Sequence, residues 1–289
     1  MRIKDIFTQK KFSLSFEVFP PKREGNLENL YTTIQELKEA KPDFISVTYG
    51  AGGSTREKTI EISSTVRNEF HMEVLAHLTC VQSTRHDIAG ILDALKEHNV
   101  ENILALRGDP PEGTKIFTKI AGGFGYANEL VEFIRAHDDF SIGVAGYPEK
   151  HSEAPSHHAD MMNLKRKVDA GADFIITQMF FLNDCFYNFR DRAEALKISV
   201  PIIPGIFPIL NHNQFTRLVS LSGAQIPNKL AEKIEKNKEN PEEVEKYGIE
   251  YAINQVANLI KNEIAGLHFY CMNRSRPVKK ILDELTLRR

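Results

Sequence analysis

Residues 13–21 read Ser-Leu-Ser-Phe-Glu-Val-Phe-Pro-Pro, an apolar stretch that carries one acidic residue, Glu17, and ends in two prolines. Its composition predicts a first β-strand over residues 13–18. A doubly wound sheet would normally follow its first strand with a glycine-rich phosphate-binding turn, whereas this chain has Phe19-Pro20-Pro21 at that place. The stretch therefore argues against a doubly wound sheet.

Seven further apolar runs predict strands at about 43–48, 73–79, 102–107, 141–146, 173–179, 200–206 and 267–271. Amphipathic segments at 27–40, 56–70, 85–98, 128–137 and 155–170 predict helices between them. Thr84 with Asp87 and Ser54 with Glu57 resemble capping boxes. Runs that are apolar on both faces suit parallel strands covered on both sides. Eight strands alternating with helices predict an α/β fold, a (β/α)8 TIM barrel.

The chain length of 289 residues fits one such barrel, so we expect a single domain over residues 1–289. Residues 229–248 read KLAEKIEKNKENPEEVEKYG, which is highly charged and poor in apolar residues. We expect this segment to form a solvated helical excursion between strands seven and eight, not a second domain.

The bulk composition is that of an ordinary globular protein. A formal net charge of −2 gives no reason to expect nucleic acid or an anionic membrane as a partner. Three widely spaced cysteines fit neither a disulfide framework nor a zinc ribbon, and favour reduced thiols. The first residues lack an apolar signal core, and no apolar run is long enough to span a bilayer. We therefore expect a cytoplasmic protein.

Active sites of this fold gather at the carboxyl ends of the strands. Polar side chains stand at or just past nearly every predicted strand end, which favours one shared pocket over separate loop contacts. These residues are Glu17, Thr48, Tyr49, His77, Thr79, Arg107, Asp109, Tyr147, Gln178, Tyr270 and Asn273.

Glu17 is the most informative of them. Phe16, Val18 and Phe19 flank it with apolar bulk, and two prolines stiffen the exit of the strand. Desolvation disfavours a charged carboxylate, so a glutamate in such surroundings can hold a proton near neutral pH. The alternative is a glutamate that points into solvent from the end of the strand.

Two further segments could bind a ligand. Gly108 lets the backbone after strand four approach a ligand closely, between Arg107 and Asp109, although these two charges could equally form a surface pair. Asp160, Asn163 and Lys167 share one face of the helix after strand five, with Arg166 beside them. Such a face could hold the phosphates and ribose of a nucleotide, or could simply be solvated.

Two other classes of barrel enzyme fit less well. His151, His157 and His158 invite a metal site, but their spacing is poor and strand one lacks the His-x-His of metal-dependent barrel hydrolases. We therefore expect no metal. Strand six ends in Thr177-Gln178 and offers no lysine for a Schiff base.

Taken together, the motifs resemble those of the 5,10-methylenetetrahydrofolate reductases, and the length is similar to the short bacterial form that has only the catalytic barrel. The similarity runs from about residue 10 to Tyr270. It rests on SFEVFPP at 15–21, SVTYG at 46–50, HLTC at 77–80, LRGD at 106–109, AGYPE at 145–149, NLKRKVDAG at 163–171, ITQ at 176–178 and PGI at 204–206.

This resemblance implies a bound FAD, NADH or NADPH as a transient electron donor, and a folate as the small-molecule substrate. In the implied ping-pong reaction, hydride passes through the flavin to methylenetetrahydrofolate and gives 5-methyltetrahydrofolate. Glu17 would be the general acid that protonates the departing amine nitrogen, and Asp109 would stabilise the iminium cation. We also expect a homo-oligomer.

The resemblance also assigns binding residues by position. Gln178, Gln214 and Arg274 would contact the folate. The residues that would contact FAD are Thr48, Tyr49, His77, Arg107, Gly108, Asp109, Tyr126, Ala127, Tyr147, His151, Asp160, Asn163, Arg166 and Lys167.

Two features depart from the well-known bacterial form. Leu218 replaces an aromatic residue that helps to place nicotinamide and folate there, and the loop over 110–125 is longer. Both bear on the electron donor. An alternative is therefore a flavin-bearing catalytic subunit that receives its electrons from a partner protein in a larger complex.

Overall fold

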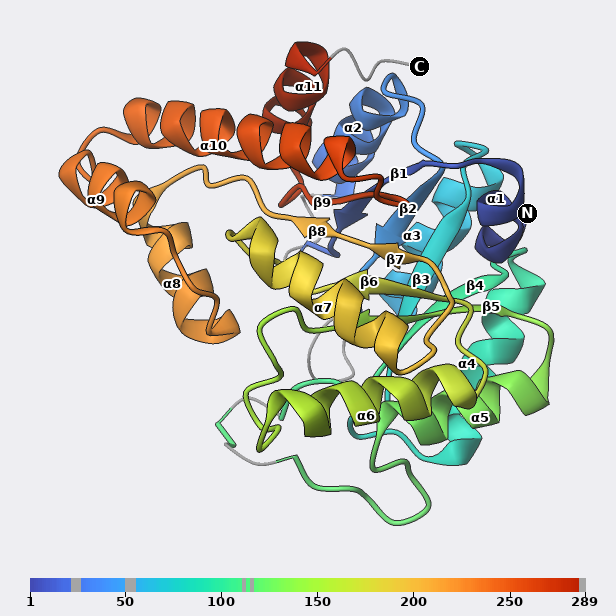
Figure 1. Ribbon diagram of the computed structural model, residues 1–289. Helices are drawn as coiled ribbons and strands as arrows, with labels where there is room; N and C mark the ends of the chain where they lie inside the picture. The colour runs from blue at the N-terminus through green and yellow to red at the C-terminus, as the bar shows by residue number, and fades with distance from the viewer. Residues whose placement is uncertain (22–26, 50–55, 111–112, 115–116, 286–289) are drawn as a thin grey trace.

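The computed structural model describes residues 1–21, 27–49, 56–110, 113–114 and 117–285, with the backbone alone for residues 56 and 218–222. Within these ranges it contains a sheet of parallel strands with helices packed around its outside (Figure 1). The strands are β1 Ser13–Val18, β2 Phe44–Val47, β3 Val74–Thr79, β4 Asn102–Leu106, β5 Ser141–Gly146, β6 Phe174–Thr177, β7 Ile202–Ile203, β8 Gly205–Ile206 and β9 Gly266–Tyr270. The fold matches the predicted TIM barrel.

Helices separate most of the strands, as the amphipathic segments predict. They are α1 Ile3–Gln9, α2 Leu27–Lys38, α3 Arg56–Asn68, α4 Arg85–Glu97, α5 Ala127–His137, α6 His157–Asp169, α7 Asn183–Ala195, α8 His212–Ser222, α9 Asn228–Lys236, α10 Pro241–Lys261 and α11 Ser275–Glu284. The capping box of Thr84 and Asp87 at the start of α4 is confirmed. Ser54, in the other predicted box, lies outside the described residues.

The barrel closes through the seventh predicted strand, which differs from its prediction. Residues 200–206 form two short strands, because Pro204 has no backbone N–H and interrupts the ladder. The first part, β7, pairs with β6, and the second part, β8, pairs with β9. Since β9 also pairs with β1, the interrupted strand joins the two ends of the sheet.

Alternate residues along each strand face opposite layers. Outward residues such as Phe16, Val18 and Ile45 pack with Leu30 and Ile34 of α2 in the main core. Inward residues near the amino ends form a second apolar cluster, composed of Phe44, Leu75, Leu104, Phe174, Ile176 and Ile203.

The N-terminal helix α1, which the sequence patterns above did not predict, closes the amino end of the barrel. Ile3 and Ile6 of α1 belong to the inward apolar cluster. Asn102 at the start of β4 anchors this helix, because its side-chain oxygen accepts a hydrogen bond from the backbone N–H of Ile3 at 2.7 Å. The interior is therefore apolar and filled at this end.

Residues 229–248 fall on α9 and the first part of α10, between β8 and β9. Figure 1 shows α8 and α9 standing to one side of the barrel. Leu230 and Ile234 of α9 and Val244 of α10 are buried in a third apolar cluster with Phe181 and Phe207, which follow β6 and β8. The apolar face of this charged segment thus packs beside the carboxyl end of the barrel.

Candidate active site

The carboxyl ends of the strands bring many of the predicted residues to one edge of the barrel. Glu17, His77, Thr79 and Tyr270 belong to the strands themselves. Others follow their strands directly, namely Thr48 and Tyr49 after β2, Arg107, Gly108 and Asp109 after β4, Tyr147 after β5, and Gln178 after β6.

Glu17 points into the barrel, towards two buried histidines. Its Oε2 lies 3.6 Å from Nε2 of His77 and 3.7 Å from Nε2 of His268, and 19% of its side chain is exposed. Phe16 and Val18 point the other way, into the layer of helices. The prediction that apolar neighbours surround Glu17 was therefore wrong, because residues adjacent in a strand face opposite sides of the sheet.

His268 is a site residue that the sequence interpretation missed. It lies on β9 two positions before Tyr270, on the same face of the strand, and is fully buried. The register pairs Glu17 with Tyr270 and Ser15 with His268, so all four residues face the interior. The two-residue period counted back from Tyr270 was the available signal.

Burial sets the ionisation of the groups around Glu17. It lowers the pKa of His77 to about 4, although the charge of Glu17 acts in the opposite direction. Burial and, to a smaller degree, Glu17 raise the pKa of Tyr270 well above its usual value. His77 and Tyr270 are therefore uncharged at neutral pH.

At the exit of β4, Gly108 adopts a φ of +86°, which favours glycine. An added Cβ there would lie 3.0 Å from Cβ of Thr79. Arg107 forms a bidentate ion pair with Glu153, with N···O distances of 2.5 and 2.7 Å. The predicted alternative of a surface pair between Arg107 and Asp109 is therefore wrong, because Glu153 from the loop after β5 accepts from both terminal guanidinium nitrogens.

The exits of β4 and β5 meet at Tyr147. Its ring makes an edge contact with the ring of His151, with centroids 4.7 Å apart. Burial, followed by the charges of Asp109 and Asp160, raises the pKa of Tyr147 to about 12. Because the charges of both carboxylates raise the pKa of the same phenol, the residues that follow β4 and those of α6 lie close to Tyr147. Asp109 itself is exposed.

Helix α6 directs two of its predicted residues towards the barrel edge. Lys167 donates a hydrogen bond of 2.5 Å to the backbone oxygen of Ala145 on β5. Burial lowers the pKa of Lys167 to about 8, and Asp160 acts in the opposite direction. Asp160 is buried and accepts a hydrogen bond from the backbone N–H of His151. Lys167 is thus a cation whose surroundings compensate its charge only in part.

Asn163 and Arg166 lie on the exposed side of the same helix, where Arg166 donates to the side-chain oxygen of Asn163 at 2.8 Å. Tyr126 is 64% exposed and occupies the N-cap position of α5, which begins at Ala127. These residues belong to the rim of the barrel edge.

The predicted folate contacts lie on the elements that follow β6, β8 and β9. Gln178 accepts a hydrogen bond from the backbone N–H of Met179. Gln214 lies in the first turn of α8, and its side-chain oxygen is buried without a hydrogen-bond partner among the described residues. Arg274 is exposed at the N-cap of α11. The side chain of Leu218 lies outside the described part of the chain.

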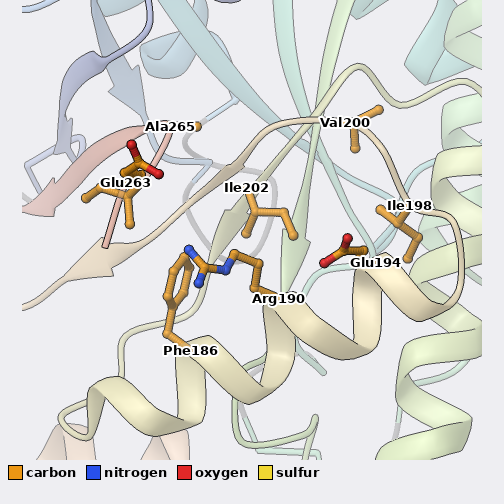
Figure 2. A pocket seen from close by; sticks show the side chains of 9 residues that line it. Phe186, Arg190, Glu194, Ile198, Val200, Ile202, Glu263 and Ala265 are labelled. Carbon is orange, nitrogen blue, oxygen red and sulfur yellow. The ribbon is translucent and has the colours of Figure 1, made fainter. Parts of the chain in front are cut away.

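A cavity of about 200 Å³ lies elsewhere, between α7 and the segments that lead into β7 and β9 (Figure 2). Its lining includes Arg190 of α7, Val200 before β7 and Ala265 before β9. These segments precede their strands, so this cavity opens at the amino edge, away from Glu17. The candidate site is therefore located by the ionisable side chains at the carboxyl edge and not by the size of a cavity.

Two properties of the described residues complete the picture. No group of three or more histidine, cysteine or carboxylate side chains among them is placed to hold a metal ion. In the same part of the chain, no helix combines the length and the apolar character needed to cross a membrane.

The carboxyl edge of this parallel barrel gathers an acid, two buried histidines, two tyrosines and a lysine whose charge is compensated only in part. This arrangement is that of an enzyme active site on a barrel fold. Comparison with known proteins identifies the family. The family model of methylenetetrahydrofolate reductase matches residues 2–286. The chain belongs to the methylenetetrahydrofolate reductase family, which confirms the resemblance seen in its motifs.

Two relatives illustrate this membership. The chain is 36% identical over 280 residues to the 5,10-methylenetetrahydrofolate reductase of Escherichia coli (strain K12), covering 97% of this chain and 93% of that protein. It is 39% identical over 297 residues to methylenetetrahydrofolate reductase (NADH) 1 of Arabidopsis thaliana. That match covers 99% of this chain and 50% of the plant protein, so the chain spans about half the length of the plant relative.

Among solved structures, a protein from Clostridium thermocellum has a similar fold. It is described as binding two copies of 5-methyl-5,6,7,8-tetrahydrofolic acid, and it superposes with a TM-score of 0.69 over 98% of this chain and 97% of that one. The two sequences are 14% identical, so this likeness concerns the fold.

Proposed function

We propose that the chain reduces 5,10-methylenetetrahydrofolate to 5-methyltetrahydrofolate by a ping-pong reaction with a bound FAD and with NADH or NADPH as electron donor. Membership of the family supports this proposal, as does the name of the Escherichia coli relative. The folate ligand of the Clostridium thermocellum protein is compatible with it. The observation that carries it is Glu17, an acid held against two buried histidines at the carboxyl edge.

The residues at this edge fit a dinucleotide cofactor. Lys167 is a cation with incomplete compensation, which suits a phosphate. The hydroxyl of Thr79, beside Gly108, is buried and has no hydrogen-bond partner within the described residues. Tyr147 adds an uncharged aromatic ring. When bound, FAD would accept hydride from the nicotinamide and pass it on to the folate.

The proposed contacts of FAD are those assigned by the family motifs. Thr48, Tyr49, His77 and Tyr147 come from strand ends, and the cations come from α6 and the exit of β4. The full set comprises Thr48, Tyr49, His77, Arg107, Gly108, Asp109, Tyr126, Ala127, Tyr147, His151, Asp160, Asn163, Arg166 and Lys167.

Glu17 is the proposed general acid. Reduction places a hydride on the bridging carbon and a proton on the departing amine nitrogen, while the bond between these two atoms breaks. A carboxyl group on a side chain that is 19% exposed and lies beside two buried histidines can reach a ligand and still be held in one orientation. Glu17 therefore supplies the proton and is left as a carboxylate.

Asp109 is the proposed stabiliser of the iminium cation that precedes hydride transfer. Its charge acts on the carboxyl edge, because it contributes to the raised pKa of the buried Tyr147. Gln178, Gln214 and Arg274 are the proposed folate contacts. The side-chain oxygen of Gln214, which has no hydrogen-bond partner in the described part of the chain, offers an acceptor for the N–H groups of a pterin.

Stopped-flow absorbance of the purified flavoprotein tests the function. Mixing with NADH or NADPH should bleach the flavin, and a second mixing with methylenetetrahydrofolate should restore its colour and give 5-methyltetrahydrofolate. A flavin that neither nucleotide bleaches, but that methylenetetrahydrofolate reoxidises after chemical reduction, would instead support a catalytic subunit fed by a partner protein. A reduced flavin that the folate does not reoxidise would refute the proposed reaction.

A further inference from the structure

Glu149, in the turn that follows β5, joins three segments of the carboxyl edge. Its Oε1 accepts a hydrogen bond of 2.8 Å from the backbone N–H of Gln225, in the loop after α8. The same oxygen accepts a hydrogen bond from the thiol of Cys185, in the first turn of α7, at 3.6 Å. One carboxylate oxygen therefore links the exit of β5 to elements that follow β6 and β8.

The donor and acceptor roles in these two contacts are unambiguous. A backbone N–H only donates, and burial raises the pKa of the Cys185 thiol to about 11, so this thiol keeps its proton at neutral pH. Burial also raises the pKa of Glu149, while the hydrogen bonds from Gln225 and Cys185 act in the opposite direction. The two donors thus offset part of the cost of burying the carboxylate.

The loop that carries Glu149 has hydrogen bonds of its own. The backbone N–H of Lys150 donates to the backbone oxygen of Tyr147 at 3.1 Å. The ammonium of Lys150 donates to the backbone oxygens of His151 and Ala154 at 3.1 and 2.6 Å. Since these bonds shape the loop without the carboxylate of Glu149, that side chain is available to hold another segment.

The start of α8 is held by contacts close to Gln214. The side-chain oxygen of Asn211 caps the helix and accepts from the backbone N–H of Gln214 at 2.8 Å. The ring of Phe215 makes an edge contact with the ring of Phe181, with centroids 6.5 Å apart. A helix of 11 residues is about 16 Å long, so an anchor at its start leaves the position of its end undetermined.

Glu149 provides a contact at the other end of this helix. The helix ends at Ser222, and Gly223 turns the chain there with a φ of +67°. Two residues further on, the N–H of Gln225 meets Glu149. Because Glu149 lies two residues after Tyr147, a proposed flavin contact, its carboxylate ties α8 to the flavin side of the site.

We infer that Glu149 is a positioning residue that holds α8, and with it Gln214, where the folate binds. This inference rests on the proposed function, in which Gln214 contacts the folate and Tyr147 contacts the flavin. A helix that takes its binding position for only a fraction of the time binds its ligand more weakly in proportion to that fraction. Loss of the bond should therefore appear in folate affinity and not in the rate of the bound complex.

Substitutions of Glu149 test this separation. Glu149→Ala should raise the folate concentration that half-saturates reoxidation of the reduced flavin about tenfold, the usual worth of a hydrogen bond to a charged acceptor. The rate at saturating folate and the FAD bound per chain should each change less than about twofold. Glu149→Gln should restore the wild-type concentration, because both bonds go to Oε1 and Oε2 has no partner among the described residues.

Substitutions of Gln225 remove the other half of the bond and decide the question even if Glu149→Ala fails to fold. Gln225→Pro deletes the N–H, whereas the matched control Gln225→Ala keeps it and loses only an exposed side chain. Gln225→Pro should weaken folate saturation as much as Glu149→Ala does, and Gln225→Ala should match the wild-type protein. Combining Gln225→Pro with Glu149→Ala should add less than about twofold, because both changes remove one bond.

Amide hydrogen exchange gives a readout without folate. The N–H of Gln225 should exchange about tenfold faster in Glu149→Ala than in the wild-type protein, and Glu149→Gln should restore its protection. Unchanged folate saturation in Glu149→Ala and Gln225→Pro would overturn the inference, as would an equal loss in Gln225→Ala. A wild-type protein that reduces no folate would instead overturn the proposed function, and the exchange rate would still decide whether Glu149 holds the end of α8.

Discussion

Replacing Lys167 by methionine should stabilise the flavin-free protein at neutral pH while weakening its hold on the flavin. Lys167 is partly exposed at the carboxyl edge, and the burial of most of its side chain lowers the pKa of its ammonium to about 8. Methionine has a similar length and no charge, so it can occupy the same space. The charge of the native lysine thus lowers the free energy of unfolding of the flavin-free protein.

The magnitude follows from the lowered pKa. A fall from 10.5 to about 8 corresponds to about 3 kcal/mol, at about 1.4 kcal/mol for each pKa unit. Methionine also loses the hydrogen bond to Ala145, which contributes about 1 kcal/mol. The expected net gain for Lys167→Met at pH 7 is therefore about 2 kcal/mol in the free energy of unfolding.

The sign of the pH dependence gives a second check. Between about pH 8 and 10.5 the unfolded chain binds the proton that the folded protein has lost, so the wild-type protein gains stability as pH rises through this range. Lys167→Met should lack that gain. If Lys167 holds a phosphate of FAD as proposed, its removal should also weaken FAD binding about tenfold or more.

Urea unfolding of the flavin-free protein at pH 7 and pH 10, followed by circular dichroism, measures both effects. Lys165→Met is the matched control, because Lys165 is on the same helix and pairs with Asp169 at the surface. That control should change stability by less than about 1 kcal/mol. A Lys167→Met variant that is less stable than the control at pH 7 would show that the charge is well compensated, and would refute the reasoning.

Three further outcomes are expected. Glu17→Gln should slow the folate half-reaction by about 10²–10⁴-fold and leave flavin reduction nearly intact in stopped-flow measurements; a parallel loss of both would make Glu17 structural. Asp109→Asn should slow folate reduction about tenfold more than flavin reduction, and an unchanged folate rate would remove its electrostatic role. Gly108→Ala should cost about 1–3 kcal/mol in thermal unfolding and lower the flavin content, because its φ is +86° and its Cβ would press on Thr79; wild-type values for both would show that the loop adapts.

The architecture was predictable because apolar strands and amphipathic helices leave strong local patterns. The prediction of the barrel and of the capping box at Thr84 depended on neighbours within a few residues. The break at Pro204 was foreseeable in principle, since a proline inside a strand cannot donate to the ladder. Helix α1 was not foreseen, because Ile3 and Ile6 are buried only against the apolar interior that distant strands form.

The candidate site was predictable only in outline. Strand ends could be read from the chain, but the partners across the barrel depend on register, which pairs Glu17 with Tyr270 and Ser15 with His268. The prediction therefore placed apolar residues around Glu17 where the structure has histidines. Likewise, no local pattern indicated that Arg107 would pair with Glu153 from a separate loop.

The apolar plug formed by α1 has a consequence for the supply of protons. Ile3, Ile6, Phe44 and Phe174 fill the amino end of the barrel, and none of these side chains can relay a proton. In the proposed reaction, Glu17 would therefore take up its next proton from the carboxyl edge, where the ligands also enter. A ligand that covers this edge would then hold the carboxyl in the protonation state that it had when the ligand arrived.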